Sequence, residues 1–294
     1  MKTLNNKANK IKHTTAQKTV FIIASVFFAL YAISMIYPLF WLFVNTFKTD
    51  RAYYELNFFP KQGQWAFNYI QAFSTLKVKK QGVFAMLFNS LWYSVGGAFL
   101  GVAVSTCLAY VVSKYKFFGR RLLTVIAIVI MMIPVVGALP SQYRIFNALG
   151  MINSPLILLC FTSGFGLNYL IMLATFDSLS WSFSEAAFID GAGHFRAFFI
   201  IMLPQVIAPL SGLILVSFIG IWNDYMSPLI FIPKLPTLAT GLYMYEALNA
   251  RKIDEMNMPI YFSGIVICML PVFILFLVFQ NTIMEISMSG GVKE

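Results

Sequence analysis

The sequence predicts an all-α polytopic membrane protein with about six transmembrane helices. Its 294 residues are 59% hydrophobic and only 11% charged, whereas a soluble globular domain is about 45–50% apolar and about 25% charged. The mean hydropathy is +0.77. If one span with its connection takes roughly 40–50 residues, about six spans fit. This composition excludes an ordinary water-soluble enzyme, a disordered chain and a fibrous repeat.

Neither the net charge nor the three cysteines indicates a binding or catalytic site. The formal net charge of +10 comes from 21 basic and 11 acidic residues. We interpret it as basic residues that flank spans and meet anionic membrane lipid. Nucleic acid is not an expected partner, because no soluble segment alternates basic and aromatic residues. Cys107, Cys160 and Cys268 lie separately in apolar runs, which favours buried side chains over disulfides or metal ligands.

The first element is a basic tail over residues 1–19, with five lysines and no acidic residue. An apolar run follows over about residues 20–47. It is too long for the apolar core of a signal peptide, about 7–15 residues, and no A-x-A site closes it. We therefore predict a retained first helix and a cytoplasmic tail. Residues 48–81 are polar with interspersed aromatics, as expected of an extracytoplasmic or interfacial loop.

Five more apolar segments are predicted spans, at about residues 83–113, 122–139, 156–176, 206–231 and 260–279. The second contains Gly97 and Gly101, a spacing that permits close helix approach. Pro134 and Pro140 predict a kink and an end in the third. Residues 280–294 are predicted to be a C-terminal tail. Basic residues are dense near span ends in the N-terminal tail and in the turn 114–121, which places both termini in the cytoplasm.

The segment 180–204, between the fourth and fifth spans, is the most informative. Ser184 can cap a short helix, and Glu185 suits the positive end of its dipole. Gly191 permits a tight backbone turn. Phe195, Phe198 and Phe199 can then anchor a second helix against membrane or protein. These residues predict a short helix–turn–helix, although an ordinary amphipathic connecting loop would account for them equally well.

The residue order in this segment resembles the EAA loop of permease subunits from binding-protein-dependent ABC importers. The loop reads E-A-A at 185–187, D-G-A at 190–192 and L-P at 203–204. One departure is Ser180-Trp181-Ser182, where many relatives carry a proline. Further positions resemble the carbohydrate (MalG-type) branch over nearly the whole chain. They are Asn89-Ser90-Leu91, Leu108-Ala109-Tyr110, Phe118-Gly119-Arg120, Ile133-Pro134, Tyr143, Leu149-Gly150, Trp222-Asn223-Asp224, Pro228-Leu229, Phe279-Gln280 and Gly290-Gly291-Val292-Lys293.

The resemblance implies that residues 20–294 form a transmembrane permease domain whose loop is a coupling helix–turn–helix. In this family the loop contacts the ATP-hydrolysing subunit and transmits its closure to the membrane helices. The resemblance implies that Glu185 makes a polar contact with the ATPase and that Ala186 and Ala187 pack closely against it. It also implies a turn at Gly191, and a role for Asp190 in bracing the loop or contacting the ATPase. The complete set of expected coupling residues is Glu185, Ala186, Ala187, Asp190, Gly191, Ala192, Leu203 and Pro204. The C-terminal tail is also expected to reach the ATPase.

The expected function is import of a sugar or oligosaccharide by alternating access, driven by a separate ATPase. The implied partners are a second homologous permease, two copies of an ATP-binding subunit and an extracytoplasmic solute-binding protein, all at a bacterial-type cytoplasmic membrane. ATP and Mg²⁺ are expected in the ATPase, because this sequence contains no G-x-x-x-x-G-K-[ST] motif. It also lacks H-E-x-x-H. We therefore expect a transport subunit without catalytic residues, metal site or cofactor of its own.

A few polar and aromatic residues inside spans are candidates for the translocation pathway. Asp224 is the strongest, because a carboxylate at membrane depth normally faces a cavity or a partner. An interfacial carboxylate that reaches water or braces a helix is the equal alternative. Asparagines can also simply bond neighbouring helices, and aromatics are common at interfaces. The candidates are Asn89, Asn168, Trp222, Asn223, Asp224 and Tyr225.

Two other functions compete with carbohydrate import. A secondary transporter or channel acting alone would require internal repeats and intramembrane charged pairs, and neither is clear in the sequence. The second is an ABC permease for a non-sugar solute. Only the resemblance to the carbohydrate branch argues against it. The sequence does not name the sugar.

Overall fold

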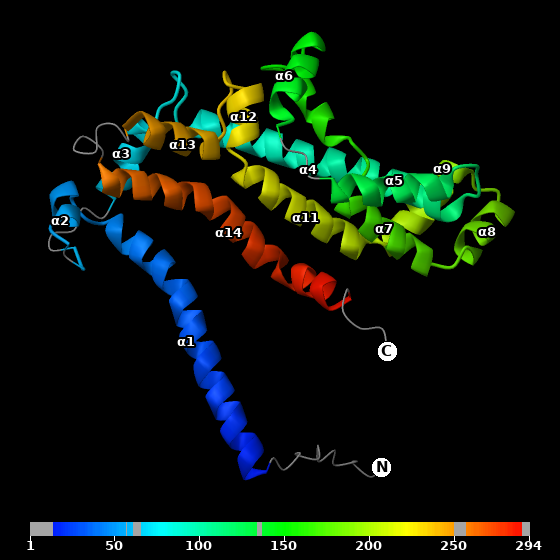
Figure 1. The fold of residues 1–294 in the computed structure, drawn as a ribbon, viewed down its shortest axis with the longest axis horizontal. Helices are drawn as coiled ribbons and strands as arrows, with labels where there is room; N and C mark the ends of the chain where they lie inside the picture. The colour runs from blue at the N-terminus through cyan, green and yellow to red at the C-terminus, as the bar shows by residue number, and fades with distance from the viewer. Residues whose placement is uncertain (1–13, 57, 61–65, 134–136, 250–256, 290–294) are drawn as a thin grey trace.

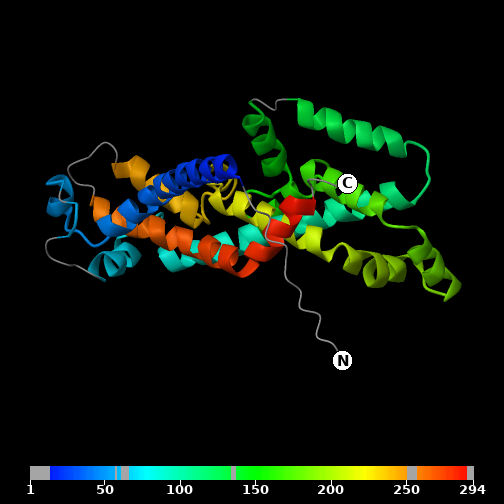
Figure 2. The ribbon, with the colours of Figure 1, turned by 90° about the horizontal axis from the view of Figure 1, so that it is seen from below.

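A computed structural model describes residues 14–56, 58–60, 66–133, 137–249 and 257–289. The described residues fold as helices that run side by side along one long axis (Figure 1). Helices α2 (Asp50–Tyr54), α3 (Phe67–Thr75) and α13 (Leu238–Asn249) gather at one end. Helices α8 (Ser182–Ile189) and α9 (His194–Arg196) lie at the opposite end, as both views show (Figures 1 and 2). Helices α4 (Val83–Lys114) and α11 (Ile207–Asn223) run between these two ends, whereas α14 (Met258–Ser289) stops short of α8 and α9.

The helix bounds in chain order are as follows. They are α1 (Thr15–Asn45), α2 (Asp50–Tyr54), α3 (Phe67–Thr75), α4 (Val83–Lys114), α5 (Arg120–Met132), α6 (Leu139–Ala148), the 3₁₀-helix η1 (Pro155–Phe161), α7 (Leu167–Ser178), α8 (Ser182–Ile189), α9 (His194–Arg196), the π-helical turn η2 (Ala197–Met202), α10 (Leu203–Gln205), α11 (Ile207–Asn223), α12 (Met226–Phe231), α13 (Leu238–Asn249) and α14 (Met258–Ser289).

Helix α1 stands apart from the rest of the bundle (Figure 1). Thr14 and Gln17 form a reciprocal capping box at its start, which satisfies backbone donors that the first turn leaves free. None of its most apolar stretch is buried within this chain. An apolar helix of this length is stable only when lipid or another protein covers it.

Helix α4 is the central element of the bundle and packs against α7, α11, η1 and α13. Its approach to η1 depends on glycine, because a Cβ at Gly97 would lie 2.8 Å from ring carbons of Phe161. A Cβ at Gly101 would lie 3.2 Å from the backbone oxygen of the same residue. The predicted G-x-x-x-G contact is therefore confirmed as a site of close helix approach.

Three helices are long and apolar enough to cross a membrane, namely α1, α4 and α14 from Met258 to Gln280. They match the predicted first, second and sixth spans. A fourth candidate is the bent pair His194–Gln205 and Ile207–Asn223, whose parts meet at 80°. The described helices reach three spans, or four if that pair is one, so six spans remain a prediction.

The other predicted spans are interrupted where residues break the helical hydrogen-bond pattern. In the predicted span 122–139, α5 ends at Met132 and α6 begins only at Leu139. Segment 156–176 is divided between η1 and α7, with glycines at positive φ between them. Segment 206–231 ends its first helix at Asn223 and restarts at Met226. Each piece is shorter than the roughly 20 residues of one straight crossing.

Both predicted tails are helical where the structure describes them, apart from Thr14. Helix α1 begins at Thr15, inside the predicted tail 1–19, and residues 1–13 lie outside the described residues. Helix α14 continues through the predicted tail as far as Ser289. The C-terminal motif Gly290-Gly291-Val292-Lys293 lies outside the described residues.

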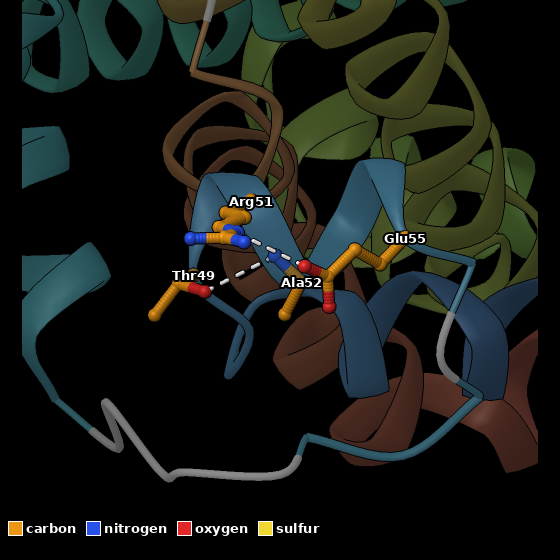
Figure 3. Close-up of polar contacts among 4 residues, drawn as sticks. All are labelled: Thr49, Arg51, Ala52 and Glu55. Carbon is orange, nitrogen blue, oxygen red and sulfur yellow. Dashed lines mark hydrogen bonds and ion pairs between the residues drawn. The ribbon is translucent and has the colours of Figure 1, made fainter.

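The loop after α1 folds back through the short helix α2. Figure 3 shows the Thr49 hydroxyl accepting the Ala52 N–H at 3.2 Å and Arg51 paired with Glu55 at 2.9 Å. The side chains of the ion pair are 90% and 45% exposed. Exposed pairs of this kind contribute roughly 0–1 kcal/mol, so the Thr49 cap is the firmer local constraint.

Candidate functional site

The segment predicted as a helix–turn–helix does form helix, turn and helix. Helix α8 begins at Ser182, whose backbone N–H donates to the Ser180 hydroxyl at 3.2 Å. The prediction that Ser184 caps the helix is wrong, because Ser184 lies within the first turn with its side chain fully buried. The helix therefore begins at Ser182 rather than at Glu185.

The turn after α8 is a Schellman motif centred on Gly191. The Ala192 N–H donates to the Ala187 carbonyl at 2.9 Å, and the Gly191 N–H donates to the Phe188 carbonyl at 3.1 Å. Gly191 has φ of +79°, a conformation that costs other residues about 1–2 kcal/mol. The predicted turn at Gly191 is therefore present, and its backbone geometry favours glycine.

Helix α8 exposes some of its polar and small residues and buries Ser184 and Ala187. Glu185, Ala186, Asp190 and Gly191 are exposed, whereas Ala187 is only 3% exposed. Ala187 therefore packs against this chain, and its packing on another protein stays a prediction. The exposed residues of α8 also include Phe183 and Ile189. The surface at this end of the molecule therefore carries a carboxylate, small side chains, the turn and two apolar side chains (Figure 1).

Aromatic rings attach this face to the end of α4. The Tyr115 hydroxyl, one residue past α4, lies 2.9 Å from Nδ1 of His194. The Tyr115 ring also contacts Trp181 at 5.8 Å between centroids, and Phe188 contacts His194 at 5.0 Å. We call Tyr115, Trp181, Phe188 and His194 the aromatic joint. It binds residues before, within and after α8 to the last turn of α4.

A polar cavity of about 640 Å³ lies beside the aromatic joint. Asp177 accepts a hydrogen bond from Ser113 at 2.5 Å, and Lys114 donates to the Leu179 carbonyl at 2.7 Å. Glu185 lines the rim of the cavity with cationic residues nearby. The full lining is Ser113, Lys114, Tyr115, Lys116, Arg120, Asp177, Leu179, Trp181 and Glu185.

The end of the loop turns sharply into α11. Pro204 follows η2, and the segment ending at Gln205 meets α11 at 80°. Proline has no N–H for the preceding turn, which is a common cause of such a bend. Leu203 is half-buried and packs against the core cluster of α4, α7 and α11, whereas Pro204 is exposed. The aromatic side chains divide, with Phe198 buried and both Phe195 and Phe199 exposed.

The candidate pathway residues do not gather in one place. Asp224 lies in the break between α11 and α12, where its Oδ1 accepts the N–H groups of Met226 and Ser227 at 2.9 and 3.0 Å. It therefore braces a helix start, one of the two alternatives for this carboxylate. Asn223 is exposed and bonds within its own helix, and Tyr225 stacks on Tyr243 with ring centroids 4.5 Å apart.

The remaining three candidates bond other parts of the chain, two of them between helices and Asn89 to two loops. Asn168 donates to the Ser217 hydroxyl at 3.1 Å and links α7 with α11. Trp222 is 2% exposed and donates to the Cys268 carbonyl, linking α11 with α14. Asn89 is buried and donates to the Gln81 side chain and to the Pro236 carbonyl. A pathway role for these residues stays a prediction, and their present contacts are structural.

Two features of the site carry no strong sequence signal. Tyr115 appears in the sequence as an ordinary aromatic residue at a span end, and only the fold brings it to His194. Gln81 lies in a polar loop yet bonds both Asn89 and the Lys234 carbonyl. Within the described part of the chain, no group of three or more His, Cys, Asp or Glu could hold a metal ion.

Comparison with known proteins gives a consistent family. Residues 97–284, more than half of the chain, match the family described as binding-protein-dependent transport system inner membrane component. The matched range includes the glycine contact in α4 and the whole segment from α8 to α11.

Several curated relatives extend the similarity over most of the chain. The maltodextrin transport system permease protein MalD of Streptococcus pneumoniae is 32% identical, over 72% of this chain and 78% of its own. MdxG of Bacillus subtilis, a maltodextrin transport system permease protein, is 27% identical over 95% of this chain and 99% of its own. NgcG of Streptomyces coelicolor, a diacetylchitobiose uptake system permease protein, is 27% identical over 86% of this chain and 83% of its own.

A solved structure has the same fold. It is a chain from the crystal structure of a bacterial ABC transporter involved in the import of the acidic polysaccharide alginate. The TM-score is 0.76 at 22% identity, with 92% of this chain and 98% of that chain covered.

Proposed function

Because this chain belongs to the binding-protein-dependent transport system inner membrane components, we propose that it is a permease subunit of an ATP-driven carbohydrate importer. The relatives that support a sugar or oligosaccharide as substrate are permeases for maltodextrin and diacetylchitobiose. The subunit works with a second homologous permease, two copies of an ATP-binding subunit that holds ATP and Mg²⁺, and an extracytoplasmic solute-binding protein. Both termini face the cytoplasm.

The observation that carries the proposal is the exposed face of α8. Glu185, Ala186 and the Gly191 turn are exposed at one end of the molecule, while Ala187 beneath them is buried. A surface with small side chains lets another protein approach closely. The exposed carboxylate of Glu185 lies in the first turn of α8, where it can accept a charge-assisted hydrogen bond from a basic residue of the ATPase.

The aromatic joint supports a route from this face into the membrane. The ATPase pulls or pushes on α8 as it closes and opens. Because the hydroxyl of Tyr115 bonds His194 and its ring contacts Trp181, α4 moves with α8. Helix α4 packs on α7 and α11, so the displacement reaches the helices that border the pathway. Alternating access then follows from two arrangements of one packed assembly.

On the far side of the molecule, the break between α11 and α12 is the proposed contribution to the pathway. Asn223 and Tyr225 are exposed there, and an exposed aromatic ring beside an amide suits a sugar. Asp224 holds the break by capping α12. Asn89, Asn168 and Trp222 fix the helices around it.

The test is sugar uptake and ATP hydrolysis in proteoliposomes that hold the assembled importer and its binding protein. We expect Glu185→Ala to abolish uptake and to remove stimulation of ATP hydrolysis by the loaded binding protein, with normal membrane insertion. Glu55→Ala is the matched control, because Glu55 is an exposed glutamate at the opposite end. Normal uptake by the Glu185 variant would refute the coupling role. The substrate is found by thermal shift of the binding protein with mono- and oligosaccharides.

A further inference from the structure

Beside the polar cavity lies a second cavity, of about 370 Å³, whose lining is apolar and aromatic. It lies between the last turns of α4 and the segment from α9 to η2. Its floor includes buried Tyr110 and Phe198, while Val111, Phe195 and Phe199 are exposed along its rim. The full lining is Cys107, Tyr110, Val111, Tyr115, His194, Phe195, Phe198 and Phe199. We call this cavity the apolar groove.

The apolar groove and the polar cavity share one residue, Tyr115. One side of this tyrosine faces aromatic and aliphatic side chains, and the other faces a cavity with Lys116 and Arg120. Those two residues also line a third hollow together with Arg121. The continuous surface is therefore apolar at one end and cationic at the other.

The cations at this surface outnumber the carboxylates beside them. Lys114, Lys116, Arg120 and Arg121 line the polar cavity and the third hollow, together with Asp177 and Glu185 in the polar cavity alone. Among the described residues, Lys116, Arg120 and Arg121 form no ion pair. The nearby carboxylate of Asp177 accepts from the Ser113 hydroxyl, and Lys114 is engaged with the Leu179 carbonyl. The lining of the third hollow contains no carboxylate, so an anion there would meet Lys116, Arg120 and Arg121.

The position along α4 indicates where such a ligand comes from. The groove begins at Cys107 and ends at Tyr115, which covers the last two turns of a helix long enough to cross a membrane. The cationic turn follows directly. An apolar groove at the end of a span and a cationic rim beyond it match the acyl chain and the phosphate of a membrane lipid.

We propose that this surface is a binding site for one anionic phospholipid. Its acyl chain lies in the apolar groove against Val111 and Phe199, and its phosphate lies on Lys116 and Arg120. Tyr115 stands between the two parts and keeps its hydroxyl on His194. The lipid therefore contacts both sides of the aromatic joint. Such a lipid comes from the surrounding membrane. It binds this chain whether or not the ATP-binding subunit is present.

The test is native mass spectrometry of the full chain, with any subunits that co-purify, titrated with phosphatidylglycerol or phosphatidylcholine. We expect wild type to bind one phosphatidylglycerol in preference to phosphatidylcholine. Each removed cation lowers the phosphatidylglycerol affinity roughly fivefold, so K116Q/R120Q lowers it about 25-fold. The matched control is K77Q/K79Q, two exposed lysines at the other end of α4, which leaves the affinity unchanged.

A second variant tests the apolar half of the site. Val111→Trp fills the groove and lowers the affinity for both lipids at this site. Val95→Trp is its control, because Val95 is an exposed valine on the same helix outside the groove. The unmodified chain provides a test that needs no variant, since phosphatidylglycerol should raise its unfolding temperature more than phosphatidylcholine does.

Three results would overturn the proposal. The first is equal affinity of wild type for the two lipids. The second is an unchanged phosphatidylglycerol affinity in K116Q/R120Q. The third is loss of the ATP-binding subunit from K116Q/R120Q with lipid affinity retained, since the surface would then be a protein interface. Lipid binding and sugar uptake are separate readouts, so failure here leaves the proposed transport function standing.

Discussion

Replacing Gly191 with alanine tests whether the shape of the α8 turn transmits motion. Gly191 has φ of +79°, and a Cβ added there would meet nothing within 4 Å, so the effect comes from the backbone alone. Holding a non-glycine residue in this conformation costs about 1–2 kcal/mol. At 1.4 kcal/mol for each factor of ten, the correctly turned loop becomes about 5–30 times less favoured. We therefore expect the rate of sugar uptake to fall by about 5–30-fold.

Gly193 provides a control two residues away. Its φ is −75° and ψ is 167°, a region open to any residue, and a Cβ there would also meet nothing within 4 Å. Gly193→Ala should therefore keep uptake within about twofold of wild type. Both variants are assayed for uptake and for ATP hydrolysis stimulated by the binding protein in the same proteoliposomes. Equal effects of the two substitutions, or none from Gly191→Ala, would refute the reasoning from backbone strain.

Three further predictions concern single contacts. Gly97→Leu should lower stability by about 1–3 kcal/mol, because Phe161 already occupies the space; thermal unfolding in detergent measures it, and an unchanged midpoint would contradict the close packing. Tyr115→Phe removes the hydrogen bond to His194 and should weaken coupling about two- to tenfold, seen as more ATP hydrolysed per sugar imported; an unchanged ratio would mean that the joint does not transmit motion. Asp224→Asn should retain uptake because the amide oxygen still caps α12, whereas Asp224→Ala should lose about 1 kcal/mol of stability. If Asn and Ala impair uptake equally while stability is kept, the charge itself is required.

The sequence predicted those parts of the fold that depend on uninterrupted apolar runs. Helices α1, α4 and α14 correspond to such runs and have about the predicted positions. Prediction was poorer where a proline, a glycine or a capping carboxylate divides an apolar segment. Asp224 shows why, because a window of average hydropathy continues through it while its carboxylate starts a new helix.

The candidate site was predicted in part for the same kind of reason. A positive φ at Gly191 and a short helix before it follow from local residue types, and both are present. Burial of Ser184 and the link between Tyr115 and His194 depend on how α8 packs against α4. Contacts between residues 79 positions apart leave no periodic pattern in the sequence, so only the folded chain reveals them.

The most direct test of the transport function is the flux of sugar measured together with ATP hydrolysis in proteoliposomes. The assembled importer should take up the sugar only with ATP and loaded binding protein, and Glu185→Ala should lose both uptake and stimulated hydrolysis. Sugar flux through this chain alone, without ATP or any partner, would contradict the proposed function and indicate a transporter or channel that acts by itself.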